Sequence, residues 1–330
     1  MLKSLAVAAM EAVVDALVVM SGVSSNAAQG ILALAMELLR TRASSPALPC
    51  MVDGGLRKLI TATMPACATD VRRCCVGSLL HVLEDANVPP TSILPVTRVA
   101  CCIGVCLVAE GASQSDSELA STLIAGIGRV ASVSTEVTTA DAASASLISS
   151  SSGVAAVALQ AVRESLKDSL EWASSCVLEL GPSTAADAHA LMNKSDALNA
   201  SEVMFVSESM KVLVVFGTLV SAVEAKRAVM GVLVPLLIEA IAPTPPAPRN
   251  ASLGAMALQL VTHMATSGVP GFKEVVASLP PQLKERMQRG LQSGTAAAQG
   301  HTKLAPGRGQ GAGSGAPSIN LKMSFSLPKA

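Results

Sequence analysis

Residues 69–80 read Thr-Asp-Val-Arg-Arg-Cys-Cys-Val-Gly-Ser-Leu-Leu, and they carry the clearest signal of local structure in the chain. Asp70 predicts the start of a helix, because its carboxylate can accept hydrogen bonds from the first free backbone amides and its charge favours the positive end of the helix dipole. Three small residues follow, Cys74, Cys75 and Gly77, and they would let a second helix approach closely. The stretch therefore predicts a helix that is capped by Asp70 and packs against a paired helix.

Apolar residues recur at helical spacing along most of the chain. The longest series advances in steps of three and four opposite a charged face: Leu159, Val162, Leu166, Leu170, Ala173, Val177 and Leu180. It predicts one amphipathic helix across these positions, with one face buried and the other in water. Another helix is expected after Asn250, a good N-cap residue that follows the proline-rich segment 243–248.

Placed in order, these helices form pairs. First members are expected to begin near Leu2, Asp53, Pro95, Val154 and Ala225, and second members near Asn26, Asp70, Asp116, Ser201 and Asn250. A recurrence of roughly 40 to 50 residues is typical of HEAT or armadillo units. The sequence thus predicts an all-α, HEAT/armadillo-like α-solenoid of about five to six helical hairpins over residues 1–292. Long internal loops are expected at about 134–153 and 181–200.

The first helix differs from an ordinary terminal helix of a solenoid. It is apolar on more than one side, whereas a capping helix has a polar outer face. We therefore expect another element, either further sequence or a partner, to stack on it.

The composition changes after Gln292. Residues 293–317 are rich in Gly, Ala and Gln and show no apolar periodicity, which is typical of a flexible linker. The chain then ends in an alternating apolar series: Ile319, Leu321, Met323 and Phe325. Alternation places these side chains on one side of an extended strand, so we expect residues 293–330 to form a flexible tail whose last segment docks on a partner protein. Folding back onto the solenoid and a frayed end are the alternatives.

Composition and charge exclude several classes of protein. Half of the residues are hydrophobic, 2% are aromatic, the mean hydropathy is +0.51 and the formal net charge is zero. A protein that wraps nucleic acid or binds anionic lipid electrostatically normally carries a basic excess. No stretch reaches the roughly 20 uninterrupted apolar residues of a membrane span, since Glu208 and Lys211 interrupt residues 203–220. We expect a soluble intracellular chain that neither binds nucleic acid nor inserts into a membrane.

No group of residues predicts an active site. Four histidines are scattered along the chain: His81, His189, His263 and His301. Cys102 and Cys106 are four residues apart on one expected helix, with Cys101 beside them, and they would place two thiols on one face. A closed zinc site needs four ligands, so buried packing in a reducing compartment is the preferred interpretation. We therefore predict no catalytic residue, no cofactor and no metal site.

Two pairs of motifs resemble known families. The Asp-Val-Arg of residues 70–72 and the Val-Pro-Leu-Leu-Ile-Glu-Ala-Ile of residues 234–241 resemble HEAT-repeat helices. Residues 271–288 (Gly-Phe-Lys-Glu-Val-Val-Ala-Ser-Leu-Pro-Pro-Gln-Leu-Lys-Glu-Arg-Met-Gln) and 318–325 (Ser-Ile-Asn-Leu-Lys-Met-Ser-Phe) are similar to the ends of very long HEAT proteins of the Laa/SWEETIE type. Those proteins accompany the clathrin adaptor of the trans-Golgi network and endosomes.

This resemblance implies a non-catalytic protein-interaction scaffold in vesicle traffic, with clathrin-adaptor components as partners and a cytoplasmic location at the surface of Golgi or endosomal membranes. It also implies a C-terminal piece or shortened relative of such a protein. The alternatives are another HEAT scaffold, of the nuclear-transport receptor or phosphatase type, and an enzyme whose site the sequence hides. A transport receptor would tend to be acidic, and this chain is neutral.

Overall fold

A computed structural model describes residues 2–22, 24–43, 52–85, 88–109, 112–133, 142–244, 250–269 and 271–300. Within these residues the regular elements are all helical, and no strand occurs. The α-helices are α1 (Leu2–Ser21), α2 (Ser25–Arg42), α4 (Arg57–Thr63), α5 (Thr69–Glu84), α6 (Pro90–Leu107), α7 (Gln114–Ala131), α8 (Ala142–Ser165), α9 (Leu170–Met192), α10 (Ala200–Leu219), α11 (Val223–Ile241), α12 (Ala251–Thr266), α13 (Phe272–Ser278) and α14 (Pro281–Gly300). A π-helical turn, η1 (Val52–Leu56), precedes α4, and a 3-10 turn, η2 (Met64–Ala66), follows it.

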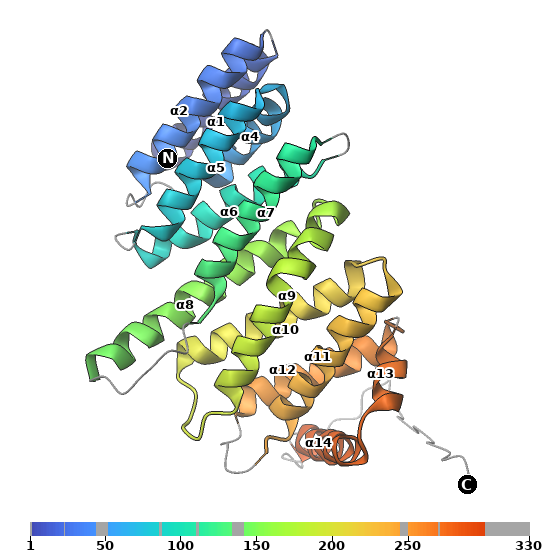
Figure 1. Cartoon of the computed structure of the whole chain (residues 1–330). Coiled ribbons are helices and arrows are strands. Elements are labelled where there is room, and N and C mark those ends of the chain that lie inside the picture. Colours follow the sequence, from blue (N-terminus) through green and yellow to red (C-terminus); the bar gives the residue numbers. More distant parts are fainter. Residues whose placement is uncertain are drawn as a thin grey trace, which may run out of the picture.

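The helices stack in two layers (Figure 1). Helices α1, α4, α6, α8, α10 and α12 pack side by side in one layer, which we call the first layer. Helices α2, α5, α7, α9 and α11 form the second layer, and α13 and α14 pack onto α11 at its end. Among the described residues five hairpins join a helix of each layer, and α12 with α13 and α14 completes the stack, so the predicted all-α solenoid is confirmed.

The length of one repeat can be read from contacts between neighbouring hairpins. Ion pairs join residues that are 43 apart (Asp15 and Lys58), 45 apart (Glu84 and Arg129, Arg163 and Glu208) and 47 apart (Arg227 and Glu274, Glu239 and Arg286). This period lies in the range of HEAT and armadillo units and above the roughly 34 residues of a TPR hairpin.

The core between the layers is built from aliphatic side chains and a few aromatic ones. Trp172 is fully buried, and its indole N–H donates a hydrogen bond to the Ser165 hydroxyl at 3.0 Å. Gly104 lies directly against this ring, and a Cβ atom there would come within 2.3 Å of it. A glycine on α6 is therefore what lets the single tryptophan enter the core.

Local capping agrees with the sequence at one expected position and disagrees at another. The side chain of Asn250 caps α12, as predicted, by accepting hydrogen bonds from the amides of Ser252 and Leu253. The expected cap at Asp70 is wrong, because α5 begins at Thr69 and its N-cap residue is Ala68, two residues before Asp70. The Asp70 side chain is 91% exposed and pairs with Arg73.

The structure also corrects the expected helix between Leu159 and Leu180. The chain leaves the helix at residues 166–169, where Ser169 accepts a hydrogen bond from the amide of Trp172 and starts α9. A single serine cap thus divides one apolar series between two helices. As a result α8 pairs with α9 and α10 with α11. The helices near Ser201 and Asn250 are therefore first members, and the helix near Ala225 is a second member, the reverse of the prediction.

The expected loop at 181–200 is wrong over its first part, since α9 continues to Met192 and the connection covers residues 193–199. Pro182 lies inside the helix on its exposed side. The carbonyl that proline leaves without an amide partner belongs to Leu178, which is also exposed. Water can solvate that carbonyl, so the helix does not end there.

The other two boundaries also shift. Helix α8 begins at Ala142, inside the expected loop at 134–153, and residues 134–141 lie outside the described residues. Helix α14 runs to Gly300, eight residues into the segment expected to be a flexible tail. Residues 301–330 lie outside the described part of the chain, and so does the predicted docking segment with Ile319, Leu321, Met323 and Phe325.

Candidate functional site

We call the outward side of α4, α6, α8, α10 and α12 the enclosed face, because its middle part, on α6, α8 and α10, is more sheltered than the second layer. No side chain of α8 between residues 151 and 165 is fully exposed, whereas α9 in the second layer exposes many, among them Leu178 at 73%. Helix α8 also approaches α6 and α10 more closely along its length than α9 approaches α7 and α11. Four buried alanines make this approach possible: Ala155, Ala156, Ala158 and Ala161.

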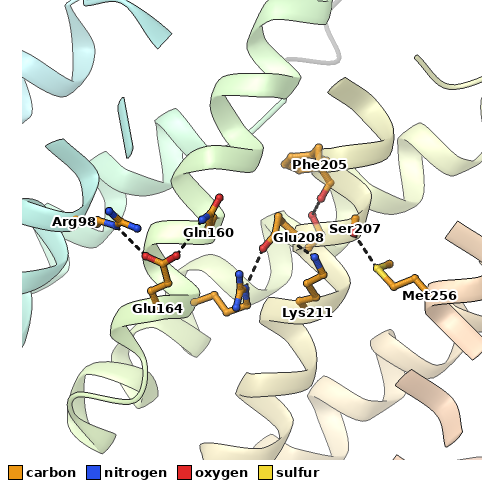
Figure 2. A network of polar contacts seen from close by, with 10 residues as sticks. Arg98, Gln160, Glu164, Phe205, Ser207, Glu208, Lys211 and Met256 are labelled. Atoms are coloured by element: carbon orange, nitrogen blue, oxygen red, sulfur yellow. Dashed lines mark hydrogen bonds and ion pairs between the residues drawn. The ribbon is translucent and has the colours of Figure 1, made fainter. Parts of the chain in front are cut away.

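Polar side chains connect each pair of neighbouring helices on the enclosed face, and we call this series the polar ladder. From α1 to α12 its contacts are Asp15 with Lys58, Thr61 with Cys102 (3.3 Å), Arg98 with Glu164 (2.9 Å), Arg163 with Glu208 (3.0 Å) and Ser207 with Met256 (2.8 Å). Figure 2 labels both partners of the Arg98–Glu164 and Ser207–Met256 contacts, which lie at the two ends of the part of the ladder between α6 and α12. The ladder runs the length of the described stack.

Two carboxylates form the centre of the ladder. Glu164 accepts hydrogen bonds from Arg98 Nε and from Gln160 Nε2 at 3.0 Å (Figure 2). Burial alone would raise the pKa of Glu164, but these hydrogen bonds and the positive charge of Arg98 hold it below its ordinary value. Glu208 accepts from Arg163 Nε and from Lys211 Nζ at 2.7 Å. Through these contacts Glu164 connects α8 with α6, and Glu208 connects α10 with α8.

Apolar side chains lie beside these charges. On α10, Met204, Ser207, Glu208 and Lys211 are spaced by three and four residues, so they share one stripe of the helix. Met204 is 41% exposed, and Met256 on α12 is half-buried. An adaptable apolar surface beside charged donors is a common composition for protein-binding sites, because methionine can repack around different partners.

Other side chains weighed from the sequence do not assemble a reaction centre in the described part of the chain. His189 and His263 are exposed, and each contacts a residue of its own helix end, Asn193 and Ser267. His81 is exposed and lies far along α5, and His301 is outside the described residues. The described residues contain no group of three or more His, Cys, Asp and Glu side chains that could hold a metal ion.

The sequence analysis did not predict the polar ladder as a candidate site, although the sequence contains a pattern that indicates it. Glu208 and Lys211 interrupt an apolar stretch, which counts against a membrane span. Charged residues that interrupt an apolar helix at a spacing of three also predict a polar stripe within a packed layer. No helix in the described residues has the length and apolar character needed to cross a membrane.

The two-layered stack of helical hairpins and its regular inter-hairpin contacts define an α-solenoid, which is a helical-repeat protein. Residues 140–303, from α8 to α14, match the family model described as LAA1-like, C-terminal TPR repeats. The chain is thus a helical-repeat protein that resembles LAA1-type proteins, as its sequence motifs indicate. Comparison with curated proteins and with solved structures gives no match.

Proposed function

We propose that this chain is a non-catalytic scaffold in vesicle traffic between the trans-Golgi network and endosomes, and that its enclosed face binds a clathrin-adaptor component. The likeness to LAA1-type proteins supports the trafficking role. The observation that carries the proposal is the polar ladder, because its centre lies within the matched residues and on the more sheltered face. In this function the protein is cytoplasmic and attaches to Golgi or endosomal membranes through its partners.

The binding mode follows from the stripe on α10. A partner segment that crosses α8, α10 and α12 would place apolar side chains on Met204 and Met256. Its polar groups would meet the Arg163 and Lys211 donors, whose contacts with Glu208 keep them in position. Protein interfaces of this kind gain most of their affinity from a few buried side chains, and the surrounding polar groups fix orientation.

The test compares two exposed apolar residues on opposite layers. Met204→Asp places a charge on the enclosed face, and Leu178→Asp places the same charge on α9 in the second layer. We expect Met204→Asp to weaken capture of purified clathrin-adaptor complex by roughly thirtyfold, about 2 kcal/mol. Leu178→Asp should leave it unchanged. Both variants should keep the helical circular dichroism of the unmodified chain.

Equal binding by both variants, or a larger loss with Leu178→Asp, would place the interaction elsewhere. Absence of adaptor binding by the unmodified chain would reject the partner. Imaging the chain in cells provides a second measurement, with Golgi and endosomal markers as the expected location and loss of that location in Met204→Asp.

A further inference from the structure

An open hollow lies at the edge of the stack where α9 and α11 end and α12 begins. Its volume is about 340 Å³, including the part that is open to solvent, so it has room for a side chain and not for a folded element. Four apolar side chains form much of its wall: Leu191, Met192, Leu198 and Leu253. None of the residues of the polar ladder lines it.

The charged residues that line the hollow leave one carboxylate without a cation. Lys194 Nζ donates to Glu202 Oε1 at 2.6 Å. Glu239 accepts from the guanidinium of Arg286 at 2.7 Å. Asp196, in the connection between α9 and α10, is exposed, and no hydrogen bond or ion pair joins its side chain to another described residue. Within the described part of the chain, the hollow therefore has one uncompensated negative charge.

The helix ends around the hollow also favour a positive charge. Helices α9 and α11 both end there, and the last carbonyl groups of a helix carry a partial negative charge. Helix α12 begins there, but Asn250 already accepts hydrogen bonds from the amides of Ser252 and Leu253. A cation in the hollow would therefore meet a carboxylate and the C-terminal ends of two helices.

Arg286 shows how this chain binds a cation at such a helix end. Its guanidinium donates to the Glu239 carboxylate and, at 3.2 Å, to the Ala242 carbonyl just beyond the end of α11. The α9 side of the hollow has the same combination of groups, the Asp196 carboxylate and the C-terminal end of α9. Lys194 on that side binds Glu202 instead. The α9 side thus resembles a cation site whose cation has to come from elsewhere.

We propose that this hollow is a docking site for an arginine side chain of a partner protein. The guanidinium pairs with Asp196 at the end of α9, and the aliphatic stem packs on Met192 and Leu198. Arginine fits better than lysine, because its planar and weakly hydrated guanidinium can donate two hydrogen bonds to one carboxylate. The site is separate from the enclosed face, so its test does not depend on the proposed function.

The test is a titration of the full chain with the tripeptide acetyl-Ala-Arg-Ala-amide, followed by the methyl NMR signals of methionine. Met192 lines the hollow and reports binding there, whereas Met204 on the enclosed face is the internal reference. Met192→Leu assigns the signal. We expect the Met192 signal to shift with a dissociation constant on the order of 1 mM and the Met204 signal to stay unchanged. The same tripeptide with citrulline, which has nearly the shape of arginine but no charge, should leave both signals unchanged.

Two aspartates provide matched variants. Asp196→Asn removes the charge from the hollow and should weaken binding of the arginine tripeptide about tenfold, as expected for the loss of one charge-assisted hydrogen bond. Asp168→Asn removes the same charge from an exposed aspartate in the connection between α8 and α9, and it should bind as the unmodified chain does. The proposal is overturned if the arginine tripeptide leaves Met192 unchanged, if citrulline shifts it equally, or if both variants weaken binding alike.

Cations of this chain that lie outside the described residues are the alternative occupants. Arg249 precedes Asn250 in the sequence, and Lys322 lies in the predicted docking segment. We expect Arg249→Gln and Lys322→Gln to bind the arginine tripeptide as the unmodified chain does. If either substitution strengthens that binding severalfold, the removed cation competes for the hollow, and the chain itself replaces the partner as its occupant.

Discussion

The terminal helices of the described stack, α1 and α14, are held to the neighbouring helices by ion pairs that differ in burial. At the C-terminal end, Arg286 on α14 donates to Glu239 Oε2 at 2.7 Å and to the Ala242 carbonyl at 3.2 Å, and only 20% and 10% of the two charged side chains are exposed. At the N-terminal end, Lys58 pairs with Asp15 on α1, but these side chains are 61% and 59% exposed. Water and salt screen an exposed pair, whereas a buried one is sensitive to the loss of either partner.

The surfaces of the two ends also differ, because one is charged and the other is apolar. Helix α14 exposes charged residues, including Lys284 and Arg289. Helix α1 exposes Val13 at 57% and Val19 at 73%, and α2 exposes Leu34 at 53%. The apolar outward side expected for the first helix is confirmed at Val13 and Val19, while an element stacked on it stays a prediction. In a solenoid each repeat touches only its neighbours, so such differences remain local and the ends can open independently.

The largest loss of exchange protection is expected when Arg286 is replaced. Arg286→Met keeps the apolar stem but leaves the Glu239 carboxylate buried without its cation, and breaking such a pair costs about 3–5 kcal/mol. Amide hydrogen exchange should therefore become faster throughout α14 and at the end of α11, while α1 keeps its rates. Arg289→Met on the same helix is the control, since Arg289 is 66% exposed and pairs with Glu285 at 3.7 Å. Equal acceleration in the two variants would contradict a special role of the buried pair.

Lowering the pH is expected to cause a smaller loss of exchange protection in α14. Burial alone would raise the pKa of Glu239, but hydrogen bonds from Thr244 and Arg286 hold it below its ordinary value of 4.5. A carboxylate with a lowered pKa in the folded state stabilises that state above its unfolded pKa, and this stabilisation is lost as the pH falls through the folded value. Exchange protection of α14, corrected for intrinsic rates, should thus fall below about pH 4.5.

Glu239→Gln is the matched variant for this measurement, because glutamine keeps a hydrogen-bond acceptor and carries no charge. Its α14 should be less protected at neutral pH and should show a weaker loss of protection in acid. The same pH profile in both proteins would assign the acid sensitivity to another group.

The helical content and the repeat length are predictable from the sequence because both depend on local patterns. Apolar residues at steps of three and four, and caps such as Asn250, act within one helix. The errors arose where local chemistry depends on the surroundings. Pro182 is tolerated in α9 because its turn faces water, and Ser169 divides an apolar series that periodicity alone treats as continuous.

The candidate site was harder to predict for a related reason. The contacts of the polar ladder join residues from 41 to 66 positions apart, and these distances follow from how the hairpins stack. Arg98 reaches Glu164 across a longer interval than the repeat length because residues 134–141 and the first turns of α8 are added between them. The sequence shows each charged residue but not which neighbouring helix supplies its partner.

The smallest effect is expected at the N-terminal pair. Lys58→Met should lower the free energy of opening of α1, measured by hydrogen exchange, by no more than about 0.5 kcal/mol. The reason is that an exposed ion pair gains little over two hydrated charges. Helix α1 is attached mainly by half-buried apolar side chains, Val14, Leu17 and Val18, which pack against the core.

Leu17→Ala should therefore lower the free energy of opening of α1 more than Lys58→Met does, by about 1 kcal/mol for the partial burial lost. Hydrogen exchange at low and high salt measures both, and the effect of Lys58→Met should vanish at high salt while that of Leu17→Ala persists. If Lys58→Met releases α1 as strongly as Arg286→Met releases α14, the two ends depend equally on their ion pairs and the contrast between them fails.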